Sequence, residues 1–173
     1  MAFESQKRIY TACGILFTVS VLYITANALP IWVTGSNESG TSSGGLWKAC
    51  QKYKGSSKCL NAGSKVLDKI MATRAFITIC CILAPLSFIS ILSIILVNEN
   101  LRKRMSLLAK VLAIASAISG IIGVGLGISR VVDTIKFTAA MEVENVKMGV
   151  SCILAIIALA LNLVGAVITF LIR

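Results

Sequence analysis

Residues 75–98 read AFITICCILAPLSFISILSIILVN, a run of 24 positions that contains no Asp, Glu, Lys or Arg. An α-helix rises about 1.5 Å per residue, so about 20 apolar residues cross the roughly 30 Å of hydrocarbon in a bilayer. The run is therefore long and apolar enough to predict a membrane-spanning helix. Its segment 91–97, ILSIILV, lacks the strict apolar and polar alternation that is typical of a transmembrane β-strand.

Three other stretches without charged residues lie at residues 9–37, 111–129 and 148–172. Of the 173 residues, 57% are apolar and 14% are charged, and the mean hydropathy is +0.89. This balance excludes an ordinary soluble globular protein. We predict a single domain, 1–173, of the all-α membrane class, with four helices that cross the bilayer at residues 9–31, 75–98, 111–129 and 148–172.

The N-terminus allows a second interpretation. Lys7 and Arg8 stand before an apolar run that reaches Ala26-Asn27-Ala28, and this order loosely fits a cleavable signal peptide, which would leave three spans. The run is longer than the apolar region of a signal peptide and continues to Trp32, where an interfacial aromatic residue is typical. These features favour a retained first helix.

The predicted spans are joined by a large loop at residues 32–74, a short loop at 99–110 and a medium loop at 130–147. With four spans, the short loop and both chain ends share one side. The dense cationic cluster Arg102-Lys103-Arg104 in the short loop favours the cytosol for that side. The large and medium loops are then extracellular, which makes Asn37, in the acceptor sequence Asn37-Glu38-Ser39, a glycosylation candidate.

The large loop holds Cys50 and Cys59, the two of the six cysteines that lie outside the apolar stretches. A lone pair in an extracellular loop normally forms a disulfide, and a zinc site would need further ligands in a chain that has no His. Residues 54–57, KGSS, favour a turn between two strands. With further strands at 32–34 and 46–49, we predict a small antiparallel sheet above the membrane, and we expect the Gly- and Ser-rich residues 34–45 to be mobile.

Several functional classes find no support in the sequence. No charged residue lies within the four predicted spans, which disfavours a proton relay or an ion pathway through one chain. The sequence has no HExxH, Gly-x-Ser-x-Gly or Walker motif, so we expect no enzyme, no cofactor and no metal site. The net charge of +10 is divided among loops and ends, so we expect no nucleic-acid partner, and anionic lipid of the bilayer explains the cytosolic part.

Gly123 and Gly127 form a GxxxG pattern in the third predicted span. Small residues at this spacing allow helix backbones to approach closely in lipid. The pattern favours packing within the bundle over a dimer interface, and the two uses are compatible.

The large loop contains Trp32, then Gly45-Leu46-Trp47 after twelve residues, then Cys50 after two and Cys59 after eight. This combination resembles the signature of the claudin superfamily, which includes claudins, peripheral myelin protein, epithelial membrane proteins and the lens fibre membrane protein. Arg74, which opens the second span, is a further match. The resemblance covers the whole four-span layout. It implies a left-handed four-helix bundle capped by an extracellular sheet, with Trp32, Leu46 and Trp47 as its anchors near the membrane.

The resemblance also implies a function. Claudins associate side by side in one membrane and across cells, and the strands that they form seal the paracellular space or conduct selected ions. We therefore expect a plasma-membrane protein of cell–cell junctions that self-associates in cis and in trans. Lys58, beside the second cysteine, is the candidate for ion selectivity, and Phe137, near the family's aromatic position in the medium loop, is the candidate for trans contacts.

Some features depart from the claudin pattern. The sequence given ends at residue 173 without a cytosolic tail, so we do not expect it to bind PDZ scaffolds. The medium loop lacks the usual Phe-Tyr-x-Pro, and the first loop is short before Gly45. These features favour the tail-less branch, whose members would act as membrane organisers, adhesion proteins or accessory subunits, and this alternative stays open beside the junction protein.

Overall fold

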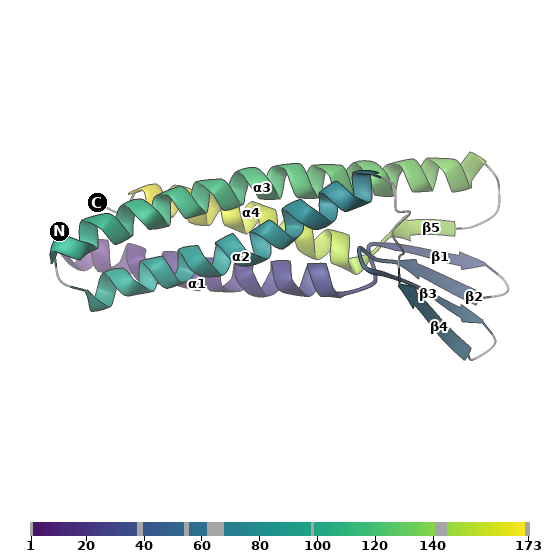
Figure 1. The fold of residues 1–173 in the computed structure, drawn as a ribbon, viewed down its shortest axis with the longest axis horizontal. Helices are drawn as coiled ribbons and strands as arrows, with labels where there is room; N and C mark the ends of the chain where they lie inside the picture. Colours follow the sequence, from purple (N-terminus) through teal and green to yellow (C-terminus); the bar gives the residue numbers. More distant parts are fainter. Residues whose placement is uncertain are drawn as a thin grey trace.

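A computed structural model describes residues 2–37, 40–53, 56–61, 68–97, 99–140 and 145–171. They form a bundle of long helices with one small β-sheet at one end (Figure 1). The helices are α1 (Ala2–Ala28), α2 (Asp68–Leu96), α3 (Glu99–Ala140) and α4 (Val150–Leu171). Each of these four helices is long and apolar enough to cross a membrane, so the predicted all-α membrane class is confirmed.

Helix α3 is longer than the sequence analysis predicted. It contains 42 residues, or about 63 Å of helix, which is about twice the hydrocarbon thickness. Residues 99–110, expected as a loop, form its first turns, and residues 130–140 form its last. Charged residues indicate where the chain leaves the hydrocarbon of the bilayer, but they do not end a helix. Arg, Lys, Leu and Met are all good helix formers. The helix therefore projects beside the sheet (Figure 1).

Small residues lie at many of the helix contacts inside the bundle, beside larger buried side chains such as Leu16 and Ile77. Helices α1 and α3 each pack against both α2 and α4. Ala12, Ala84 and Ala158 are completely buried between helices. By contrast, Ile118 and Val167 expose 54% and 60% of their surface. Helices in lipid associate through small side chains and close backbone contact, so this distribution is that of a bundle whose outer surface meets lipid.

A polar cluster at the centre of the bundle takes one residue from each helix: Tyr23, Cys80, Ser116 and Asn162. Asn162 is fully buried, and its Nδ2 donates a hydrogen bond to Oγ of Ser116 at 3.0 Å. The thiol of Cys80 donates to the carbonyl oxygen of Ser116 at 3.5 Å. Gly120 leaves room for Tyr23, because a Cβ at Gly120 would lie 2.5 Å from the Tyr23 hydroxyl. This central polar cluster thus brings one residue of each helix together, with hydrogen bonds from α2 and α4 to Ser116 of α3.

The sheet joins the large loop to the segment before α4. Its strands are β1 (Val33–Asn37), β2 (Gly40–Gly44), β3 (Lys48–Tyr53), β4 (Ser56–Asn61) and β5 (Asn145–Met148). Their order is β4-β3-β2-β1-β5, and all neighbours are antiparallel. Figure 1 shows the sheet beyond the bundle, with β5 nearest to the end of α3.

The predicted sheet is confirmed, with two differences. The hairpin around the cysteines is present, although residues 54 and 55 of its turn lie outside the described residues. The described part of residues 34–45, which we expected to be mobile, forms most of β1 and β2. Strand β5 was not predicted. Gly and Ser have low strand propensity. However, β5 pairs with β1 and β3 pairs with β2, and this pairing on both sides keeps β1 and β2 in the sheet.

The central polar cluster leads to a prediction about the free energy of unfolding of the bundle. We expect Asn162→Leu and Ser116→Ala to be coupled by about 0.6 kcal/mol in a double-mutant cycle, because they share one buried interhelical hydrogen bond. Unfolding of the purified protein by SDS in mixed micelles would measure this coupling. Ser93→Ala is the control, since Oγ of Ser93 donates to the carbonyl oxygen of Ile89 in its own helix, at 2.8 Å. A coupling of Asn162 to Ser116 no larger than that to Ser93 would contradict the prediction.

Candidate functional site

Trp32 connects the sheet to the helices. Its side chain is 4% exposed and packs against α3, where a Cβ at Gly127 would lie 2.5 Å from the indole ring. Its Nε1 donates to the carbonyl oxygen of Ala26 at 2.9 Å. Its backbone NH donates to Gly44 at 2.8 Å, and its carbonyl oxygen accepts from the NH of Gly149 at 2.9 Å. One residue thus contacts α1, β2, α3 and the start of α4.

Gly45 and Leu46, which lie between β2 and β3, also attach the sheet to the helices. Gly45 lies directly against the backbone of Pro30, where no Cβ would fit. Leu46 is 4% exposed and belongs to the same apolar cluster as Trp32 and Val131 of α3. Gly45 is therefore required on steric grounds, and Leu46 attaches the loop to the bundle by its burial.

Trp47 and Arg74 complete the attachment on the outside. The indole Nε1 of Trp47 donates to Oδ1 of Asn27 at 2.8 Å, at the end of α1. The guanidinium group of Arg74 lies 5.0 Å from the centre of the Trp47 ring, and its Nε donates to the carbonyl oxygen of Leu46. This combination of stacking and hydrogen bonding suits arginine and not lysine. The signature residues of the large loop therefore converge on one joint between sheet and bundle.

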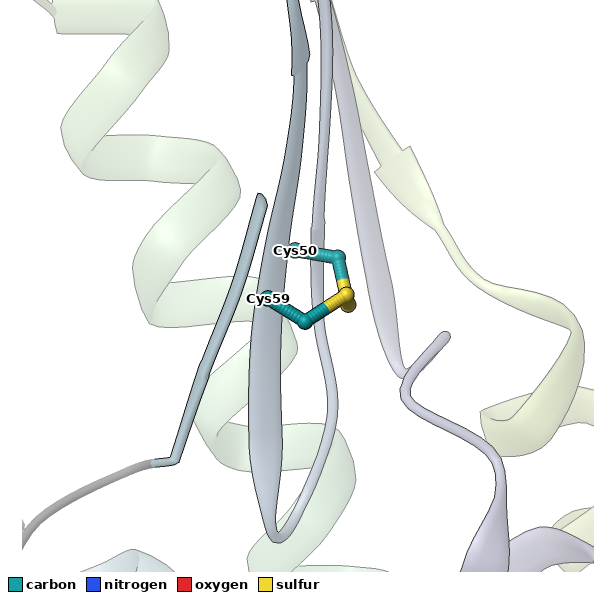
Figure 2. The surroundings of a disulfide bond; sticks show 2 residues. All are labelled: Cys50 and Cys59. Atoms are coloured by element: carbon teal, nitrogen blue, oxygen red, sulfur yellow. A yellow bond between two sulfur atoms is a disulfide. The ribbon is translucent and has the colours of Figure 1, made fainter. Parts of the chain in front are cut away.

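The disulfide lies within the hairpin of β3 and β4. Cys50 and Cys59 are direct partners in the antiparallel register, and their sulfur atoms are bonded. Figure 2 shows the two side chains joined on one face of the sheet. The predicted disulfide is therefore present, and it holds the outer edge of a sheet whose central strands are rich in Gly and Ser.

The sheet has two different faces, because side chains alternate along each strand. The disulfide face, defined by the register, carries hydroxyl groups and exposed lysines beside the cystine: Thr34, Ser36, Thr41, Ser43, Lys48, Lys52, Ser57 and Lys147. The opposite helix face includes Val33, Gly35, Ala49, Gln51, Lys58, Leu60 and Val146, and these residues line a cavity beside α3. None of the five strands, as described, contains Asp or Glu.

The remaining sequence candidates do not gather at one place. Lys58 lies on the helix face, on the side opposite to the disulfide. Phe137 is 63% exposed on the projecting end of α3. Asn37 ends β1, but its side chain and residues 38–39 lie outside the described residues, so glycosylation stays a prediction.

The GxxxG pattern is used inside the molecule. A Cβ at Gly123 would lie 3.0 Å from Cβ of Phe76 on α2, and Gly127 receives Trp32. Both glycines therefore face protein, in agreement with the preference for packing within the bundle. Gly125, between them, has open space around its Cβ position.

The sequence analysis missed three functional residues. Asn27 holds Trp47, and its polarity in an apolar stretch was the available signal. Gly149 lies against the backbone of Ile31, and Arg130 lines the cavity. Their roles depend on how distant segments meet, so no local pattern could have identified Gly149 or Arg130.

Comparison with known proteins agrees with this geometry. The family described as the PMP-22/EMP/MP20/Claudin family matches residues 9–169, which is most of the chain. No curated protein matches the chain. The matched segment includes all five strands and the complete joint around Trp32.

The contact between Trp32 and Gly127 predicts different effects for two similar substitutions. We expect Gly127→Ala to lower the free energy of unfolding by about 1–3 kcal/mol, because the new methyl group must displace the buried ring. Gly125→Ala has space and should be neutral or stabilising by up to about 1 kcal/mol. Thermal unfolding in detergent, followed by tryptophan fluorescence, measures both, and equal effects of the two variants would refute the assigned contact.

Proposed function

Because the chain belongs to the PMP-22/EMP/MP20/Claudin family, we propose that it is an integral protein of cell–cell contacts. It self-associates within one plasma membrane and across two, and it forms a tight-junction-type barrier or ion-selective path between cells. The disulfide face of the sheet carries this proposal, since it is a polar, positively charged surface held outside the bundle on a rigid joint.

The proposed orientation places the sheet outside the cell and the termini in the cytosol. Both chain ends lie at the end of the bundle opposite to the sheet (Figure 1). The exposed cluster Arg102-Lys103-Arg104 lies in the first turns of α3, at that same end. Cationic residues beside a span favour the cytosolic side, and a disulfide favours an oxidising compartment on the other side.

Charge on the disulfide face supports selection of anions. Lys48, Lys52 and Lys147 are exposed there among hydroxyl groups, with no carboxylate in the described strands. Charges act over roughly 10 Å at 0.1 M salt, so such a face attracts anions and repels cations in a narrow intercellular space. These three lysines, rather than Lys58, are the proposed selectivity residues, because Lys58 faces α3.

Exposed apolar side chains support self-association. Leu60 on the edge strand β4 is 75% exposed, and Phe137 at the far end of α3 is 63% exposed. Phe137 lies on the part of α3 that projects beside the sheet, where a protein on a second cell would meet it, whereas Leu60 pairs with Ala49 at the end of β4 nearer to the bundle. We propose Phe137 for trans contacts.

Strand formation tests the proposed function. We expect the tagged protein, expressed in cells without endogenous junction strands, to produce continuous intramembrane strands at contact zones in freeze-fracture images. Phe137→Ser should reduce the contact enrichment of the protein, whereas Phe170→Ser, on the α4 surface near the cytosolic end, is a matched exposed control. A diffuse membrane signal, or enrichment without strands, would overturn the junction role in favour of a membrane organiser or accessory subunit.

Ion selectivity gives a second test. We expect dilution potentials across transfected epithelial sheets to show a preference for anions, and the triple variant K48Q/K52Q/K147Q to shift the potential toward cations. R102Q/K103Q removes two positive charges at the opposite end and should leave the potential unchanged. A clear cation preference of the unmodified protein would contradict the role assigned to the disulfide face.

A further inference from the structure

A cavity of about 560 Å³ lies between the helix face of the sheet and α3. Its apolar lining includes Trp32, Leu46, Ile70 and Val131, which come from the large loop, α2 and α3. Cavities of roughly 300–1,000 Å³ with apolar walls and a few polar groups are typical sites for organic ligands. The cavity is too large and too apolar to be explained as a site for a small ion.

The charged groups of this cavity are all positive. Lys58 and Arg130 line it, and no Asp or Glu is among its lining residues. Arg130 is half-buried, and the positive charge of Arg74 acts on it. Asp133 lies one turn further along α3, but it pairs with Lys69 at 2.9 Å. Among the described residues, Arg130 therefore has no acidic partner.

A second arginine increases the positive potential nearby. The Nη2 atom of Arg74 is buried and has no hydrogen-bond partner among the described residues. Half-buried arginines are normally paired, because a cation that loses water without gaining a partner is costly. No Asp or Glu among the lining residues of the cavity balances this positive charge.

The position of the cavity along α3 indicates the kind of anion. Gly127 belongs to the uncharged stretch 111–129, whereas Arg130, Thr134 and Thr138 follow it, and all four residues line the cavity. The cavity therefore extends across the level at which hydrocarbon gives way to headgroups. An amphipathic molecule meets apolar walls at one end and cations with hydroxyl groups at the other.

We propose that this cavity binds a lipid with an anionic phosphate headgroup, taken from the leaflet on the side of the sheet. The phosphate lies between Arg130 and Lys58, whose N–H groups donate to its oxygens. The apolar part of the lipid lies against Trp32 and Val131. Bound lipid then fills the space between sheet and α3 and supports the angle of the sheet. The inference is independent of strand formation between cells.

Quenching of Trp32 by brominated lipid tests the proposal, because Trp32 lines the cavity. The full chain, with Trp47→Phe to leave Trp32 as the only fluorescent indole, is placed in phosphatidylcholine vesicles. Brominated phosphatidylglycerol or brominated phosphatidylcholine is then titrated over the same range of mole fractions. We expect brominated phosphatidylglycerol to quench Trp32 at a concentration about tenfold lower than brominated phosphatidylcholine. One charge-assisted hydrogen bond provides a preference of this size.

Three variants make this test specific. Arg130→Gln should remove the preference for phosphatidylglycerol, whereas Arg130→Lys should retain part of it and Arg102→Gln, at the opposite end of α3, should leave it intact. Val146→Phe fills the cavity from β5 without changing any charge and should also remove the preference, so the proposal is still tested if Arg130→Gln does not fold. Glycerophosphate in the buffer distinguishes a soluble anion from a lipid.

Several outcomes would overturn the proposal. Equal quenching by the two brominated lipids would show ordinary contact with surrounding lipid. An equal loss of preference in Arg102→Gln would show general attraction of anionic lipid to a basic protein. Full displacement of the lipid by millimolar glycerophosphate would show that the cavity recognises a phosphate group alone and not a lipid.

Discussion

The insertion of Trp32 against Gly127 is the contact on which the position of the sheet depends. The chain leaves α1, places one large aromatic side chain on α3, and starts the first strand at the next residue. Because the indole is also hydrogen-bonded to Ala26, it cannot rotate away from the bundle without losing a buried partner. The close backbone approaches at Gly45 and Gly149 follow from the same geometry, since they bring β2 and the start of α4 beside this residue.

This joint lets a weak sheet keep a defined orientation. A small sheet with central strands such as GTSSG has few apolar side chains with which to form a core of its own. Its order comes from antiparallel pairing on both sides, from the cystine at its outer hairpin, and from its attachment to the bundle. The disulfide face is therefore free to be polar and basic, while the helix face encloses the cavity beside α3.

The bundle follows a different physical rule. Water does not drive its helices together, so they are held by close packing of alanine and glycine and by the buried polar cluster around Ser116 and Asn162. Helix α3 links the two parts of the molecule. It packs within the bundle at Gly123, receives Trp32 one turn later, and then continues along the sheet as far as the exposed Phe137.

The sequence by itself determined the membrane class, the number of long helices and the hairpin with Cys50 and Cys59, because hydropathy, charge and cysteine spacing are local properties. The resemblance to a known family added Trp32, Leu46 and Trp47 of the joint, whereas the structure added Asn27 and Gly149. The tertiary structure alone decided which face Lys58 occupies, that α3 continues past its charged residues, that residues 145–148 complete the sheet, and that Arg130 meets a cavity. Each of these depends on contacts between segments far apart in the chain, and the energy of such contacts is not encoded in any single stretch of sequence.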